Sequence, residues 1–316
     1  MKRALLGTIT AVGLAVSTTI AAAADWAPPG PVKLLIAFGA GGGADTQARM
    51  IATALEEQLG WKFIPEQVTG KGGINMLTAL SKEPADGTAL GMAVTEALGY
   101  NLYVADTDLT PSDFSGITTT AGFQLAIVGQ TEDGWKTMFD VIEAAKGGQK
   151  ISVGVMSPRI DDLTYLLQRE HGVEMNTVAY RGGRLVLNAI TAGDVDIGFV
   201  AGPQGPGVRA GELVELASGM SKPLNATPDA PLLSDLGVDF HAEGQFVFVA
   251  PGGLPAEAQT AFADAIEAIV TDGDQEVAKI INKVFGGPQV IKAADLDAVL
   301  QKGYNDAAAL LKEVEN

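Results

Sequence analysis

The chain has 316 residues, 47% of them hydrophobic, which is enough to bury the cores of about two globular domains. Its formal net charge of −17 argues against binding to nucleic acid or to an anionic lipid surface. The chain has no cysteine, which excludes disulfides, thiolate metal sites, a thiol nucleophile and a lipid-attachment cysteine.

The N-terminus has the pattern of a secretory signal peptide. Two basic residues precede an apolar run over residues 4–20, and four alanines follow it. We therefore predict that residues 1–24 are a signal peptide, cleaved near Ala23 or Ala24, and that the mature protein is periplasmic. A retained membrane anchor is the alternative, which the small residues and the cleavage pattern disfavour.

An apolar strand, a glycine cluster and a helix follow. Val32–Phe38 has strand length, Gly39–Gly43 requires a turn, and Thr46–Leu59 has apolar residues at helical spacing. We expect Asp45 to be the N-cap of this helix. The backbone N–H groups at the helix start, with the positive end of the helix dipole behind them, predict a seat for an anion in the loop.

Strands and helices then alternate. Lys62–Glu66 and Thr88–Val94 have strand character, and Ile74–Lys82 between them has the pattern of a short helix. Such alternation predicts a mainly parallel sheet with helices on both faces.

The strand, turn and helix design recurs in the middle of the chain. Strand Lys150–Val155 leads into the turn Met156–Arg159, and a helix with Asp161 and Asp162 in its first turn ends near His171. The other predicted strands are Gln124–Gly129, Val178–Arg181, Asp196–Val200 and Gly244–Pro251; the other predicted helices are Lys136–Lys146, Gly182–Ala192, Pro255–Asp272, Asp274–Phe285 and Asp295–Val314; Gly202–Gly211 is predicted to be a loop.

Two units of this kind predict an α/β fold of two lobes that face a cleft. We expect residues 25–123 and 244–316 to form lobe 1 and residues 124–243 to form lobe 2. The chain then passes from one lobe to the other twice. A ligand is then expected at the carboxyl ends of the strands, between the lobes.

A dinucleotide site is the main competing interpretation of the glycine loop. Gly39–Ala44 matches G-x-G-x-x-A after a strand, and Glu66 lies where a ribose-binding acid is expected. An exported protein meets little nicotinamide cofactor, however, and Asp45 places a negative charge where the pyrophosphate would lie. We therefore predict no cofactor.

Catalytic motifs are also absent from the sequence. It contains neither G-x-S-x-G nor H-E-x-x-H, and its two histidines, His171 and His241, stand apart. Asp161 and Asp162 are adjacent, so on a helix they point about 100° apart and make a poor catalytic pair. We predict no enzyme activity and no metal site.

Arginines near the predicted strand ends are candidates for binding a carboxylate. Arg159, Arg181 and Arg184 lie at or after strands whose ends face the expected cleft, and a guanidinium can hold a carboxylate through two hydrogen bonds. Surface salt bridges are the structural alternative. Glu96, after the third strand, is a candidate for recognising an amine or hydroxyl group, with a solvated loop charge as its alternative.

Several segments together resemble the Bug proteins, the periplasmic substrate-binding components of tripartite tricarboxylate transporters. Phe38–Arg49 is similar to the family's F-x-x-G-G-x-x-D-x-x-x-R, and Pro84–Leu90 to its P-x-D-G-x-x-L turn. Val178–Gly182, Ala192–Asp196 and Thr227–Gly237 resemble its V-P-Y-K-G, G-G-x-V-D and P-T-x-x-E-x-G segments. The resemblance covers nearly the whole mature chain, and its specificity lies in the order and spacing of the motifs.

The resemblance implies a two-lobed Venus-flytrap protein that binds a small organic acid, without catalysis, for the membrane components of the transporter. It also implies that two loops, here 38–45 and 154–162, close around a ligand carboxylate. In the second loop the chain departs from the family, because Arg159 is bulky, Asp162 replaces a histidine and Pro158 removes a backbone donor. The ligand-binding residues expected are Phe38, Gly41, Gly42, Gly43, Asp45, Thr95, Met156, Ser157, Arg159, Asp162, Arg181, Ala201 and Gly202.

The predicted function is thus capture of a small mono- or dicarboxylate by a monomeric periplasmic protein. Two alternatives stay open from the sequence. One is a secreted α/β enzyme that uses the same cleft, and the other is a sensor subunit that presents its ligand to a membrane receptor.

Overall fold

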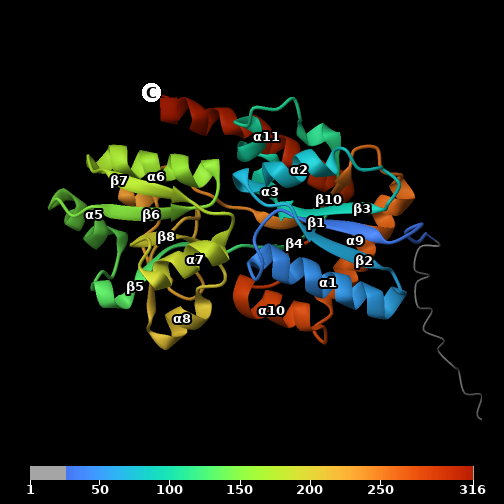
Figure 1. The fold of residues 1–316 in the computed structure, drawn as a ribbon, viewed down its shortest axis with the longest axis horizontal. Helices are drawn as coiled ribbons and strands as arrows, with labels where there is room; N and C mark the ends of the chain where they lie inside the picture. The colour runs from blue at the N-terminus through green and yellow to red at the C-terminus, as the bar shows by residue number, and fades with distance from the viewer. Residues whose placement is uncertain (1–25, 316) are drawn as a thin grey trace, which may run out of the picture.

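The computed structural model describes residues 26–315, so the predicted signal peptide lies outside the described residues. Two lobes lie side by side, each built around its own five-stranded sheet (Figure 1). Within the described range, no helix combines the length and the apolarity that crossing a membrane requires.

The first sheet has the strand order β2-β1-β3-β10-β4. β1 (Val32–Ile36) pairs in parallel with β2 (Phe63–Gln67) and with β3 (Ala89–Val94). β10 (Gln245–Pro251) lies antiparallel between β3 and β4 (Phe114–Gly122). All six residues of β3 are buried because the strand lies at the centre of the sheet, which explains its continuous apolar run.

The second sheet has the order β7-β6-β8-β5-β9. β6 (Ile151–Val155) pairs in parallel with β7 (Met175–Ala179) and β8 (Ile197–Ala201), and β5 (Leu125–Gln130) pairs antiparallel with β8 and β9 (Leu213–Ser218). In each sheet four strands run in the same direction and one, β10 or β5, runs against them, so the prediction of a mainly parallel sheet holds except at these two strands. β4 and β9 are strands that the sequence analysis did not predict.

The helices cover the sheets on both faces (Figure 1). α1 begins at Gly43, and its N-cap is Gly42 in an extended conformation, so the prediction that Asp45 is the N-cap is wrong. α8 lies in the segment predicted as a loop. The helices are α1 (Gly43–Leu59), α2 (Ile74–Leu80), α3 (Thr95–Leu98), α4 (Tyr100–Tyr103), α5 (Met138–Lys146), α6 (Pro158–His171), α7 (Gly183–Ala192), α8 (Gly205–Ala210), α9 (Ala256–Thr271), α10 (Glu276–Phe285) and α11 (Ala293–Glu315).

The closing helices pack on the first sheet. α9 and α11 pack against β4, and α9 and α10 also contact α1. The last turns of α11 reach the second lobe and contact α6, where Arg169 donates a hydrogen bond to the backbone oxygen of Glu313 at 2.7 Å and pairs with its carboxylate (Figure 1). The exact lobe boundaries stay a prediction.

Candidate functional site

The two loops predicted from the sequence lie at the junction of the lobes. The loop after β1 leads into α1, and the loop after β6 leads into α6. Gly39 N–H donates to the carbonyl oxygen of Arg181 at 3.0 Å, and Arg184 Nε donates to the carbonyl oxygen of Gly41 at 3.3 Å. Gly182, with φ at 145°, allows this approach, because a Cβ there would lie 3.0 Å from Gly39 N.

A cavity of about 50 Å³ lies between the lobes, with walls from both sheets. It has room for about three or four water-sized groups. Most of its walls are apolar side chains and glycine, and Glu96 is its one charged lining residue. The lining consists of Phe38, Gly42, Gly43, Ala44, Val94, Glu96, Asn101, Phe123, Leu125, Met156, Ser157, Ile160, Gly183, Ala201, Pro203 and Phe246.

The start of α1 forms one end of this cavity. Gly42, Gly43 and Ala44 line it, and N–H groups in the first turn of a helix have no intrahelical acceptor. With the positive end of the α1 dipole behind them, they favour a negatively charged group. Gly43 has no room for a side chain, because a Cβ would lie 2.7 Å from the ring of Phe246.

Asp45 lies in this first turn and faces the loop. Its carboxylate accepts hydrogen bonds from Gly41 N–H at 2.9 Å, from Arg49 Nε at 2.7 Å and from Gln67 Nε2 at 3.2 Å. These donors bind Asp45 to its own lobe, so the residue holds the shape of the glycine loop.

The start of α6 has a different chemistry. Ser157 is the N-cap, and its Oγ accepts a hydrogen bond from Ile160 N–H at 3.4 Å. Pro158, at the first helical position, has no N–H. Fewer free donors therefore face the cavity from α6 than from α1.

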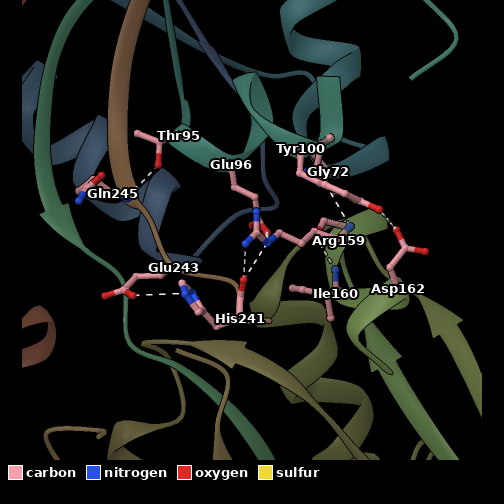
Figure 2. Close-up of polar contacts among 12 residues, drawn as sticks. Gly72, Thr95, Glu96, Tyr100, Arg159, Ile160, Asp162, His241, Glu243 and Gln245 are labelled. Atoms are coloured by element: carbon pink, nitrogen blue, oxygen red, sulfur yellow. Dashed lines mark hydrogen bonds and ion pairs between the residues drawn. The ribbon is translucent and has the colours of Figure 1, made fainter. Parts of the chain in front are cut away.

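Arg159 connects the two lobes beside the cavity. Its Nε donates to the carbonyl oxygen of His241 at 2.9 Å and lies 3.4 Å from Oε1 of Glu96, which is 8% exposed (Figure 2). Burial raises the pKa of Glu96, and the Arg159 charge opposes this shift. Burial and then the Arg159 charge lower the pKa of His241, while Glu243 opposes them.

A second interlobe contact joins α4 to α6. Tyr100 Oη donates to the carboxylate of Asp162 at 2.5 Å, and Arg159 N–H donates to Asn101 Oδ1 at 3.3 Å (Figure 2). Burial raises the pKa of Asp162, and the hydrogen bond from Tyr100 opposes it. The second loop is thus bound to the first lobe through its own side chains.

Six of the predicted binding residues line the cavity, namely Phe38, Gly42, Gly43, Met156, Ser157 and Ala201. Thr95 and Arg159 line a neighbouring polar cavity of about 220 Å³ instead. Asp162 points to Tyr100, Arg181 contributes its backbone oxygen to Gly39, and Gly202 packs against Phe285. Gly41 and Asp45 hold the loop. The binding role of all thirteen residues stays a prediction.

Much of the apolar lining was missed by sequence reasoning. Phe246 at the start of β10 and Phe123 after β4 reach the cavity from segments far apart in the chain. The sequence offered one signal for these residues, their position in the chain. Phe246 lies near the start of a predicted strand, and Asn101 lies five residues after the candidate Glu96. The structure also brings Glu96, which the sequence offered as a candidate for recognising an amine or hydroxyl group, to the cavity wall.

The fold is that of a two-lobed binding protein with a cavity between its lobes. Among the described residues no group of three or more His, Asp or Glu side chains is placed to hold a metal ion. A family model described as "Tripartite tricarboxylate transporter family receptor" matches residues 47–315, and the chain belongs to this family, TctC. It is accordingly a solute-binding protein and not an enzyme.

Individual relatives agree with this assignment. The chain is 26% identical to protein BugT of Bordetella pertussis over 78% of this chain and 78% of the relative. The structure of the periplasmic binding protein BugD superposes with a TM-score of 0.80 at 20% identity, covering 92% of this chain and 99% of that one. The Rhodopseudomonas palustris protein Rpa4515, solved with adipate, superposes with a TM-score of 0.76 at 24% identity, covering 92% and 97%.

Proposed function

We propose that the protein captures a small organic carboxylate in the periplasm and delivers it to the membrane components of a tripartite tricarboxylate transporter. The observation that carries this proposal is the start of α1, whose glycine backbone lines a cavity between the lobes. The carboxylate of adipate in a protein of the same fold is consistent with it.

In this proposal the first-turn N–H groups of Gly43 and Ala44 bind the ligand carboxylate. Phe38, Phe246 and Met156 enclose the apolar part of the ligand. Closing the lobes removes water from these hydrogen bonds, which strengthens them because the local dielectric constant falls. Lobe 1 (25–123 and 244–316) and lobe 2 (124–243) move as two bodies, and the protein acts as a monomer.

The test is calorimetric titration of the mature protein after unfolding and refolding to remove any bound solute. A panel of mono-, di- and tricarboxylates of two to eight carbons is compared with the matching amides, which have the same shape and no charge. We expect at least one acid to bind and its amide to bind at least a hundredfold more weakly. Failure of every acid to bind would contradict the proposal.

A further inference from the structure

The charges around the cavity are unevenly distributed. Glu96 is the one charged residue of the lining, and the nearby cation, Arg159, is already engaged by Glu96 and by the carbonyl oxygen of His241. Arg184 lies outside the lining, at the carbonyl oxygen of Gly41. A ligand in the cavity is therefore surrounded by walls that contain both the backbone donors of α1 and one carboxyl group.

The polar neighbours of Glu96 are engaged as well. Asn101 donates to the carbonyl oxygen of Gly72 at 3.1 Å and accepts from Arg159 N–H, and Ser157 caps α6. Glu96 is thus the acceptor that the surrounding residues leave available to a ligand.

One oxygen of Glu96 lacks a hydrogen bond within the described part of the chain. Oε1 is fully buried and accepts none, since the nearby Arg159 N–H is directed to His241. A buried carboxyl oxygen without a hydrogen-bond donor is costly, and the Arg159 charge at 3.4 Å offsets only part of the lost hydration. Because Glu96 lines the cavity, an N–H or O–H group of a ligand there would bind its carboxyl group.

We propose that the ligand is a small monocarboxylate whose short apolar body carries one hydrogen-bond donor, an amino or hydroxyl group, that binds Glu96. The inference rests on the proposed function, since it assigns the ligand carboxylate to the start of α1. Glu96 is then the specificity-determining residue of the cavity.

The same arrangement disfavours a dicarboxylate. A second carboxylate would lie against the Glu96 carboxyl group in an apolar cavity, where repulsion between like charges is poorly screened. Arg159 offers little compensation, because Glu96 and the His241 carbonyl group occupy its guanidinium. The specificity of this chain thus differs from that of the adipate-bound protein of the same fold.

The test compares acids of matched length by calorimetry on the refolded protein. The series is butanoate, its 2- and 4-amino and 2- and 4-hydroxy derivatives, and succinate, repeated with the six-carbon acids. We expect an amino or hydroxy acid to bind at least tenfold more tightly than both the unsubstituted acid and the diacid. Separate amino and hydroxy arms identify which donor the site prefers.

Glu96→Gln supplies the second readout. The variant keeps an acceptor oxygen but loses the charge, so we expect the preference over succinate to fall at least tenfold and the preference for an amino acid over the unsubstituted acid to weaken. Glu243→Gln is the matched control, because Glu243 lies in the neighbouring polar cavity and pairs with Lys222. It is expected to leave the ranking unchanged.

The outcomes separate the two proposals. If acids bind but a diacid is the tightest ligand, or if Glu96→Gln leaves the ranking as it was, the assignment of Glu96 is wrong while the carboxylate-binding function stands. If no acid binds, both proposals fall. The ranking in the unsubstituted protein decides the question even if Glu96→Gln does not fold.

Discussion

The loops after β1 and β6 occupy equivalent places in the two lobes but have different neighbours. The first has glycine at its helix start and opens its backbone to the cavity. The second has Arg159 and Asp162, which bind Glu96, His241 and Tyr100 beside the cavity. The comparison shows how a repeated strand, loop and helix can open its backbone to a cavity in one lobe and hold the lobes together in the other.

The largest effect is expected from Arg159→Met. Removing the guanidinium leaves Glu96 buried without a cationic partner, so we expect the free energy of unfolding to fall by about 3 kcal/mol, the usual cost of breaking a buried pair. Urea unfolding of the ligand-free protein measures it. The double variant Arg159→Met, Glu96→Gln should recover part of the loss. If the double variant lost as much stability as Arg159→Met alone, the pair would not couple the lobes.

A smaller effect, on binding, is expected from Gly43→Ala in the first loop. The new Cβ would lie 2.7 Å from the ring of Phe246, which must move into the cavity that it lines. We expect the Kd for the tightest acid to rise at least tenfold, about 1.4 kcal/mol. Calorimetry measures the change.

Gly30→Ala is the control for Gly43→Ala, since a Cβ at Gly30 meets no atom within 4 Å. It should bind the acid like the unsubstituted protein. Unchanged affinity in Gly43→Ala would contradict the assignment of the cavity as the binding site.

Tyr100→Phe tests the second loop with a smaller expected loss of stability than Arg159→Met. The change removes the donor to Asp162 but keeps the ring, and we expect a loss of about 1 kcal/mol in the free energy of unfolding. Tyr165→Phe, on the exposed side of α6, is the matched control and should be neutral. A neutral Tyr100→Phe would show that this contact does not join the lobes.

The smallest effect is a pH dependence. The pKa of Glu96 is raised above its ordinary value of 4.5 by burial, so the folded protein binds this proton more tightly than the unfolded chain. The stability from Glu96 is therefore fully present below pH 4.5 and is lost as the pH rises through the folded-state pKa.

Glu96→Gln isolates this contribution because glutamine does not titrate. The free energy of unfolding of the variant minus that of the unsubstituted protein should become more positive as the pH rises above 4.5, measured by urea unfolding from pH 4 to 8. A constant difference across this range would show that burial does not perturb Glu96.

The two strand, loop and helix units could be predicted because their signals are local. The apolar run before Phe38 and the glycines after it define a strand and a turn, whatever the rest of the chain does. Strand direction has no such signal. β10 is an apolar run that would look the same in a parallel or an antiparallel pairing, which is why its direction was not foreseen.

Two strands escaped prediction because their polar residues are satisfied by distant partners. Thr119 and Thr120 in β4 are buried and bond to the Gln289 backbone and to Gln47. Glu215 in β9 accepts from Gln204 and Thr227. Likewise, the sequence offered Arg159 as a ligand-binding residue, because nothing local shows that Glu96 and the His241 carbonyl group occupy it.

The contact of the last turns of α11 with α6 has a practical consequence. A helix that packs on one sheet ends against the other lobe, so the lobe movement of the proposed function would change the separation of these two helices. Since the chain lacks cysteine, single cysteines introduced on α6 and α11 would accept a pair of dyes at those positions alone. Energy transfer between the dyes would then convert the protein into an optical sensor for its own solute.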